Sequence, residues 1–473
     1  METRQTIQLA LLVFGMSIGV AAQNAQTPAE TTPAPAMGQS APVLNPENPP
    51  VTGLDEPGLD LHPASRSFIS PALQASESAD TNAENDLGTS SVSSVARVIG
   101  ALDLQQFWPK SDLILEYLGG GAFYSSPSDV KQMEAFGLEA VTRWRTGQVT
   151  LRDAFSYLPD GSFELGFGGN PGLGIATSGG IGSGESGGGL PGTHVFGTGQ
   201  FGAVGNIPRL TNTAILDAVQ AINPVSAFTV AGGFSNAHFY DSADCTNNPL
   251  LVCLINSDQV TIEGGYSHLM NRHDQIGLVY AYQVFQFPQL TGGSLYVNVL
   301  NLRYSHSITG RMSFVVGAGP EYTELEQGGY ASTWSLSARA QLRYKLNHAS
   351  IVASYEKYTS SGSGFYAGSN VQAARLGYTR PLGRTWDLYA DLGYSHNTPV
   401  QNTPGSDLGV SAFSSSYNEG SAGFILRKHL GREYDFFAAY HFSELGLDGI
   451  PGVEQRQVGT VGVEWHPRPT RIE

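Results

Sequence analysis

Charged side chains alternate with apolar ones in several segments of this sequence of 473 residues. The segment from Ser335 to Leu346 shows the pattern most clearly, because Arg339, Arg343 and Lys345 alternate there with leucine, alanine and tyrosine. Successive side chains of a β-strand point to opposite faces, so the segment is predicted to be a strand with one apolar and one charged face. Charges gathered on one face of such strands could line a water-filled passage and set its ion preference.

The same alternation, applied to each predicted strand, collects basic and acidic residues on one common face. The basic candidates are Arg143, Arg145, Arg303, Arg339, Arg343, Lys345, Arg375, Arg427 and Arg456, and the acidic candidates are Glu116, Glu139, Glu263, Glu321, Glu356, Asp387, Asp391, Asp435 and Glu464. A basic residue facing lipid near the bilayer midplane would cost roughly 2 to 4 kcal/mol, which favours an inward position. The two signs nearly balance, so two interpretations stay open: the charges line an open pore, or they pair across the lumen and close it.

Strands of this kind recur from Phe68 to Trp465, and short and long connections alternate between them. The short connections contain the sequences WPKS, RTGQ, MNRHD, ITGR, LNH, PLGR and LGRE, and the longer ones lie near Ser125, Asp244, Pro288, Gly328, Gly362, Pro404 and Leu447. In outer-membrane barrels the short turns face the periplasm and the long loops face outward. The sequence therefore predicts an all-β fold, a transmembrane antiparallel up-and-down β-barrel.

One segment is ambiguous, and the alternation of connections decides it. The segment from Leu210 to Ile222 has apolar residues at helical spacing and many alanines, which favours a helix when it is taken alone. The strands before and after it both run outward, however, so an inward strand is needed between them. Counting this segment as a strand gives about 18 strands, an even number with both ends in the periplasm. If a weak N-terminal strand is wrong, 16 is the next even number.

The rest of the chain divides into segments of different composition. Residues 1–22 resemble a secretory signal peptide, and residues 23–66 form a Pro/Ala-rich leader, interpreted as a disordered periplasmic linker with a protein-binding role left open. The barrel is expected over 67–466, followed by a tail at 467–473. Residues 159–208 form a long Gly-rich loop, which either folds into the channel or stays a mobile surface loop.

Composition agrees with a barrel of many strands and excludes some other classes. Charged residues make up 14%, aromatic residues 10%, and there are 58 glycines. Beyond the N-terminal segment no run of 18 apolar residues occurs, which excludes a helical membrane protein. Aromatic residues fall near predicted strand ends, as in interfacial girdles: Trp144, Trp334, Trp386, Tyr394, Tyr434 and Trp465.

No catalytic or metal site is predicted. The histidines do not have metal-ligand spacing, and no cofactor is expected. Ser235 and His238 lie close in sequence, but serines are so numerous that such pairs arise by chance, and no nucleophile motif is present. We therefore expect a protein that is not an enzyme. Cys245 and Cys253 flank a predicted external loop, where an oxidising compartment favours a disulfide over two free thiols.

The alternating strands, the turns such as ITGR and PLGR, and the terminal strand QVGTVGVEWHP together resemble a Gram-negative outer-membrane β-barrel of the porin-like type. The resemblance is architectural and contains no motif that fixes a substrate. It implies outer-membrane lipid and the barrel assembly machinery as partners, although Trp465 is followed by HPRPTRIE rather than ending the chain. Porin-like barrels are often trimers, so a homo-oligomer stays open, and no nucleic-acid partner is expected.

Two functions follow from the resemblance and the inward charges. The first is a channel in the bacterial outer membrane for passive diffusion of small hydrophilic solutes through a charged lumen. The alternative is a closed structural or adhesive barrel without transport. A soluble exported β-protein is a further alternative, because its strands could bury the apolar face inward instead.

Overall fold

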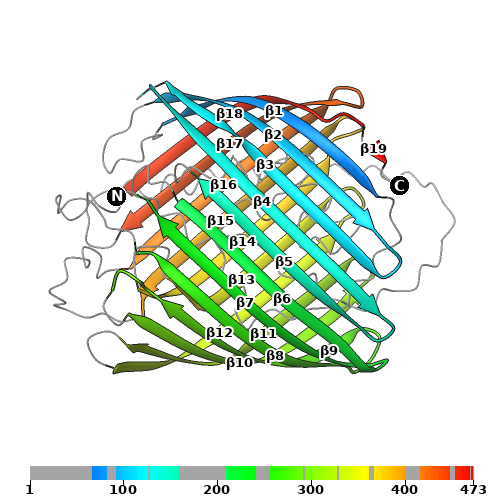
Figure 1. Ribbon diagram of the computed structural model, residues 1–473, viewed down its shortest axis with the longest axis vertical. Helices are drawn as coiled ribbons and strands as arrows, with labels where there is room; N and C mark the ends of the chain where they lie inside the picture. Colours follow the sequence, from blue (N-terminus) through cyan, green and yellow to red (C-terminus); the bar gives the residue numbers. More distant parts are fainter. Residues whose placement is uncertain are drawn as a thin grey trace. The chain divides into compact units, whose positions relative to one another are not determined.

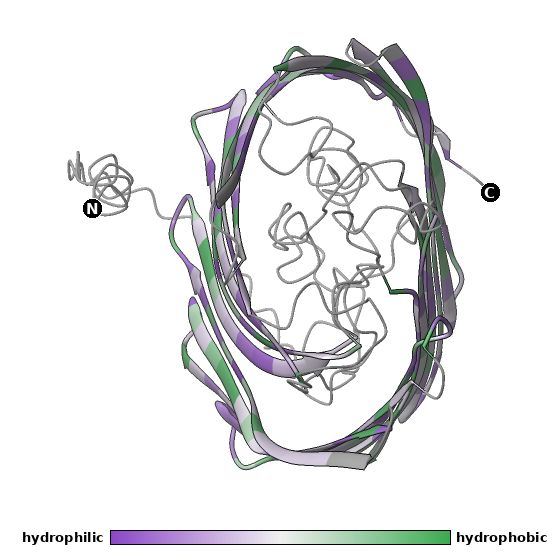
Figure 2. Cartoon of the chain, turned by 90° about the vertical axis from the view of Figure 1, so that its left-hand side faces the viewer, coloured by the Kyte–Doolittle hydropathy of each residue, from purple (hydrophilic) through white to green (hydrophobic). Residues whose placement is uncertain are grey.

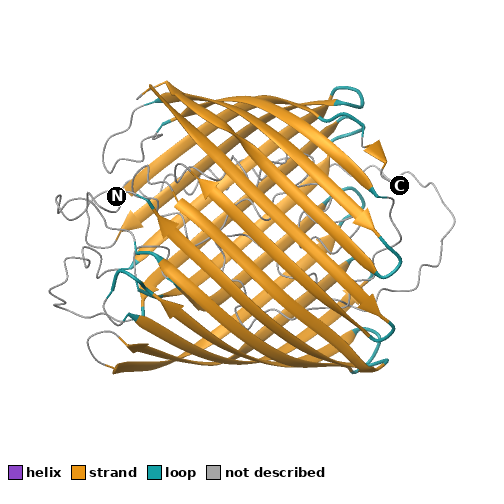
Figure 3. Ribbon diagram, viewed as in Figure 1, coloured by secondary structure: helices purple, strands orange, loops and turns teal. Residues whose placement is uncertain are grey.

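The computed structural model describes residues 67–81, 92–125, 128–158, 209–240, 255–290, 293–326, 330–361, 367–400, 416–447, 453–468 and 470–471. All of these residues belong to one compact unit of the chain. These residues form one antiparallel sheet that closes on itself (Figures 1 and 3). Within the described ranges no helix is long and apolar enough to cross a membrane.

Eighteen long strands make the wall, each paired with the next along the chain. They are β1 (Phe68–Asp80), β2 (Ser93–Phe107), β3 (Ser111–Ser125), β4 (Ser128–Trp144), β5 (Gly147–Leu158), β6 (Arg209–Asn223), β7 (Ser226–Phe239), β8 (Ser257–Leu269), β9 (Asp274–Gln286), β10 (Ser294–Thr309), β11 (Met312–Glu326), β12 (Tyr330–Lys345), β13 (Ser350–Ser360), β14 (Ser369–Pro381), β15 (Trp386–Pro399), β16 (Tyr417–His429), β17 (Tyr434–Leu447) and β18 (Val453–Trp465). The prediction of an antiparallel barrel of about 18 strands is confirmed.

The ring closes between the first and the eighteenth strand. Leu73 to Asp80 of β1 pair with Trp465 to Val458 of β18 while β1 also pairs with β2. A two-residue strand, β19 (Thr470–Arg471), pairs with Phe68 and Ile69 of β1, so part of the expected tail belongs to the sheet. Closure gives the first and last strands a backbone partner on both sides, as a barrel in lipid requires.

The two faces of each strand differ as the sequence pattern predicts. On β2, Val98 and Leu102 are exposed while Arg97 and Asp103 are buried, and the same alternation of exposed apolar and buried polar residues occurs around the ring. In a closed ring the exposed apolar face points outward and the other face points inward. Figure 2 looks into the ring with the residues coloured by hydropathy.

The segment from Leu210 to Ile222, which was ambiguous in the sequence, is a strand, and its pairing shows why. Strand β6 pairs with β5 along its length and with β7 through a register shift between Ala221 and Asn223. Its inward face carries Thr213, Ile215 and Asp217, which are buried. The apolar residues at helical spacing are thus divided between both faces of a strand, because pairing on two sides outweighs the weak helical propensity of the segment.

The connections are less regular than predicted. At one end of the barrel all strands are joined by short turns, two of which contain glycines with positive φ, Gly383 (+92°) and Gly431 (+90°). At the other end, the connections expected to be long near Ser125 and Gly328 span only residues 126–127 and 327–329. The strands there extend almost to each other, since β3 ends at Ser125 and β4 begins at Ser128, and β11 ends at Glu326 and β12 begins at Tyr330. We call the two ends the turn end and the loop end.

The ladder between β12 and β13 stops halfway up the wall. Its last pair toward the loop end is Ala338 with Lys357. Beyond this pair β12 continues beside β11, and β13 continues beside β14, through Ser360 paired with Ser369. The two parts of the wall therefore separate toward the loop end, and Figure 2 shows two layers of strands along one part of the ring.

Candidate functional site

The backbone register places the predicted strand residues on the inward face of the barrel. Arg303, Glu321, Arg427 and Glu464 are almost completely buried there. The remaining inward positions are those of Arg143, Arg339, Arg343, Lys345, Arg375, Arg456, Glu139, Glu263, Glu356, Asp387, Asp391 and Asp435. Glu116 occupies the register position opposite Asp103 and Gly137. Arg145 differs from all of these, because it lies in the turn after β4 and is exposed.

Ion pairs between inward residues run along the wall. Arg143 lies 2.5 Å from Asp112 on the neighbouring strand, and Arg339 lies 3.4 Å from Glu356. The seam carries another pair, in which Arg456 Nε donates to Asp80 Oδ1 at 3.0 Å. Each of these pairs joins adjacent strands. A pair of this kind compensates both charges without either side chain reaching across the lumen.

The densest charged cluster lies near the turn end of β15 to β18. Arg427 lies 3.6 Å from Asp435 and 3.7 Å from Glu464. His429 contacts two carboxylates at 2.8 Å each, Asp435 through Nδ1 and Asp387 through Nε2. Four adjacent strands, β15 to β18, are thereby tied together by polar contacts on the inward face. The described residues contain no group of three His, Cys, Asp or Glu side chains arranged to hold a metal ion.

Several charged residues of the inward face were not predicted from the sequence. Arg152 and Asp217 form a buried ion pair between β5 and β6. Arg97 donates to Ser78 Oγ at 2.8 Å, and Asp80 pairs with Arg456. The alternation on β5, with Gln148, Thr150 and Arg152 on one face, was a sufficient signal for Arg152. Asp217 was not predicted because the pattern of its segment also fits a helix. Asp80 was not predicted because it is the last residue of a strand with a weak alternation pattern.

Where the two parts of the wall overlap, the outward face of β13 lies against the inward face of β11. Thr359 lies on the outward face of β13, yet its hydroxyl donates to Glu321 Oε1, an inward residue of β11, at 2.6 Å. The Ser335 hydroxyl of β12 donates to the same carboxylate oxygen at 2.8 Å. The loop ends of β13 to β15 therefore lie inside the barrel, behind β11 and β12.

An apolar cluster continues this overlap toward β9 and β10. Ala367 and Val400 pack against this cluster. It contains buried inward residues of the strands together with residues 255, 287 and 290 beyond the strand ends: Ile255, Ala281, Phe285, Phe287, Leu290, Leu295, Val297, Val299 and Leu325. Gly368, at φ +94°, is so close that a Cβ there would lie 2.6 Å from Leu295 Cδ2. The inner layer thus covers an apolar part of the wall and occupies space within the lumen.

The outward face has the composition of a surface that contacts lipid. Leu216, Val230, Ile262 and Leu302 project from the middle of their strands and are each more than half exposed. Aromatic residues mark both borders of this surface, with Trp144, Trp386, Tyr434 and Trp465 at the turn end and Trp334 and Tyr394 toward the loop end. Closed barrels with such an apolar outer band are membrane-spanning structures.

Some sequence-based predictions fall outside the described residues. These are the signal peptide at 1–22, the leader at 23–66, the Gly-rich loop at 159–208 and the disulfide between Cys245 and Cys253. They stay predictions. The Ser235 and His238 pair is separated by the strand alternation, because Ser235 faces inward beside Thr213, whereas His238 lies on the outward face.

Comparisons with known proteins give likeness only at the level of architecture. No protein-family model and no curated protein matches the sequence. Among solved structures, OccK2 (OpdF) of Pseudomonas aeruginosa, in complex with glucuronate, is 12% identical with a TM-score of 0.41, over 85% of this chain and 100% of that one. OpdO of the same species is 11% identical with a TM-score of 0.40, over 85% and 97%.

A further structure, the FrpB iron transporter from Neisseria meningitidis, is 9% identical with a TM-score of 0.41, over 82% of this chain and 64% of that one. Likeness this distant assigns neither substrate nor mechanism. The strand pairing, the closed ring and the two faces of the wall establish the class by themselves. The chain is a closed antiparallel β-barrel of 18 long strands with an apolar outward face and a polar inward face.

Proposed function

We propose that the chain is a channel of the bacterial outer membrane through which small hydrophilic solutes diffuse passively. The observation that carries this proposal is the direction of three ion pairs on the inward face. Arg143 with Asp112, Arg339 with Glu356, and Arg456 with Asp80 each join adjacent strands of the wall. Charges held in this way line a passage, whereas a lumen closed by its charges would need pairs that reach across it.

The outward and inward faces support a location in the outer membrane. The outward face is apolar between two aromatic borders, and the inward face holds polar groups that lipid would not solvate. An even number of strands joined by short turns at one end is the architecture of bacterial outer-membrane barrels. Under this proposal the turn end faces the periplasm and the loop end faces outward.

The lumen charges would select solutes by polarity and charge. The inward residues named from the sequence, with Asp80, Arg97, Asp112, Arg152 and Asp217, present both signs along the wall. Such a wall offers hydrogen bonds and compensating charge to a polar solute and offers little to an apolar one. The inner layer of β13 to β15 would narrow the lumen toward the loop end and limit the size of solutes.

The same inner layer favours the alternative, a closed structural or adhesive barrel. Thr359 and Val400 lie inside the ring. Thr359 contacts Glu321, and Val400 packs against the apolar cluster that includes Leu295. A layer held by buried contacts could close the passage instead of narrowing it. The two functions differ in one measurable property, because a closed barrel conducts no ions.

Single-channel recording in a planar bilayer tests the proposal. The purified protein is refolded, its folding is checked by the change of gel mobility on heating, and current is recorded with equal and with unequal salt on the two sides. We expect discrete, stable current steps and a reversal potential that differs from zero in the salt gradient. Folded protein that inserts and gives no steps would contradict the channel and support the closed barrel.

A further inference from the structure

The turns at the turn end carry positive charge although the protein as a whole is acidic. The sequence contains 41 acidic and 25 basic residues. The turn residues described at this end, with residues 466–468 after β18, include one acidic residue, Glu433, and seven basic ones. The basic ones are Lys110, Arg145, Arg272, Arg311, Arg384, Arg432 and Arg468. The turn end is therefore a basic rim on a protein whose sequence is acidic overall.

This basic rim lies next to the aromatic border of the lipid-facing surface. Arg145 follows Trp144 directly, and the Lys428 ammonium lies 5.2 Å from the ring centre of Trp386. Tryptophan and tyrosine at such borders sit at the level of the lipid headgroups. Cations one or two residues beyond them are at the level where the phosphate groups of a lipid leaflet would lie.

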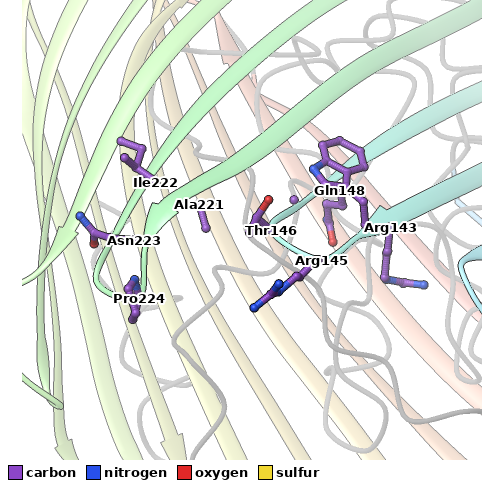
Figure 4. A pocket seen from close by; sticks show the side chains of 10 residues that line it. Arg143, Arg145, Thr146, Gln148, Ala221, Ile222, Asn223 and Pro224 are labelled. Carbon is purple, nitrogen blue, oxygen red and sulfur yellow. The ribbon is translucent and has the colours of Figure 1, made fainter.

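The rim contains a hollow of about 430 Å³ between two turns, the one after β4 and the one after β6. Figure 4 shows its lining, in which Arg145 extends from one turn toward the space beside Asn223 and Pro224 of the other. Trp144 and Ile222, two exposed apolar side chains, also line it. The hollow thus offers a cation and an amide together with apolar surface.

Hydrogen bonds hold the two turns together around this hollow. The indole N–H of Trp144 donates to Gln220 Oε1 at 3.0 Å, and the Gln220 amide donates to Thr146 Oγ1 at 2.9 Å. Gly147 allows the close approach, because a Cβ there would lie 2.4 Å from the Val219 carbonyl oxygen. The hollow is therefore preformed, and a ligand would not have to order its walls.

The two arginines of the hollow have different roles. Arg143 is bound to Asp112 at 2.5 Å on the inward side. Arg145 is exposed at the tip of its turn and projects into the hollow. A guanidinium offers paired N–H groups that match the oxygen atoms of a phosphate, so Arg145 is the group that an anionic ligand would contact.

We propose that this hollow binds the phosphate group of an anionic phospholipid from the leaflet at the turn end. Arg145 holds the phosphate, the Asn223 amide donates to it, and Trp144 and Ile222 contact the glycerol and the first carbons of the acyl chains. The proposal rests on the membrane location in the proposed function but not on conduction, so lipid binding and channel activity can fail independently.

Native mass spectrometry of the folded barrel in detergent tests this site. Phosphatidylglycerol and phosphatidylcholine are titrated against the wild type, Arg145→Gln and a matched control, Arg384→Gln, whose turn does not line the hollow. We expect a tightly bound phosphatidylglycerol in the wild type and the control, and weaker binding by roughly tenfold or more in Arg145→Gln, since one charge-assisted contact is lost. Arg145→Lys should bind with intermediate affinity.

The other outcomes overturn the proposal. Equal binding by Arg145→Gln and the wild type would exclude Arg145, and an equal loss in Arg384→Gln would assign the effect to the whole rim. Equal binding of phosphatidylcholine would exclude a site for an anionic lipid. Displacement by inorganic phosphate or glycerol phosphate at the concentration of the lipid would indicate a site for free phosphate compounds. Single-channel recording of Arg145→Gln shows separately whether the channel still conducts.

Discussion

The Thr359 hydroxyl donates a hydrogen bond of 2.6 Å to the Glu321 carboxylate, although Thr359 lies on the outward face of its strand and Glu321 on the inward face of another. In a single-layered ring these two faces never meet. The contact therefore identifies the place where the wall overlaps itself. Both residues are buried, with 2% of each surface exposed, so the carboxylate depends on protein donors rather than on water.

Replacing Thr359 by valine should destabilise the barrel by about 1 to 3 kcal/mol. Valine keeps the shape of threonine but leaves the buried Glu321 carboxylate with one donor fewer. Unfolding by denaturant in lipid vesicles, followed by tryptophan fluorescence, measures the effect. Thr333→Val is the matched control, because Thr333 is exposed on the inward face of β12 and should change stability by no more than about 0.5 kcal/mol. Similar effects of both substitutions would argue against the overlap.

The buried pair of Arg152 and Asp217 should show strong coupling. Removing one partner leaves the other charge buried without compensation, and we expect a loss of roughly 3 to 5 kcal/mol for Arg152→Met or Asp217→Leu alone. The double substitution should lose much less than the sum of the two single ones. A double-mutant cycle of unfolding free energies measures the coupling, and additive losses would show that the two side chains do not interact.

The position of the lipid boundary can be tested along one strand. Leu302 projects outward from the middle of β10, and Ile308 projects outward near its turn end; their exposed fractions are 55% and 46%. Leu302→Arg should cost about 2 to 4 kcal/mol, whereas Ile308→Arg should cost about 0 to 1 kcal/mol because its charge reaches the interface. Folding free energies in vesicles distinguish these values. Equal costs would contradict the assignment of β10 to a membrane-spanning wall.

Ion selectivity should follow the charges near the turn end of the lumen. Arg343 and Lys345 lie at inward positions of β12, and replacing both by glutamine removes two positive charges from the wall. The reversal potential in a salt gradient should then shift toward a greater preference for cations. Lys428→Gln serves as the control, since Lys428 lies on the outward face of β16 beside Trp386. An equal shift in the control would mean that the selectivity does not arise in the lumen.

Most of the fold could be predicted because a barrel wall has a simple sequence period. On β12, alternate residues have opposite surroundings, so Arg339 can be assigned to the inward face and Leu336 to the outward face without knowledge of any partner strand. On β6 the same rule gave no clear result, since Ala and Ile occur on both faces. There the need for antiparallel neighbours on both sides identified the strand.

The overlap could not be predicted from the alternation alone. Thr359 and Val400 occupy outward positions, and nothing in their own strands separates an outward face against lipid from one against protein. A signal did exist on β10, where Leu295, Val297 and Val299 put apolar residues at inward positions. Apolar residues on the lumen side of a strand indicate that another layer covers them, although they do not say which one.

The inner layer also constrains the order in which the barrel can form. The ends of β13 to β15 lie inside the wall of β9 to β11, and a ring that had already closed would block their entry from outside. We therefore expect residues that pair across the closing seam, such as Arg456 with Asp80, to come together after Val400 has packed against the apolar cluster of the wall. A barrel that closed earlier would leave these three strand ends outside the wall.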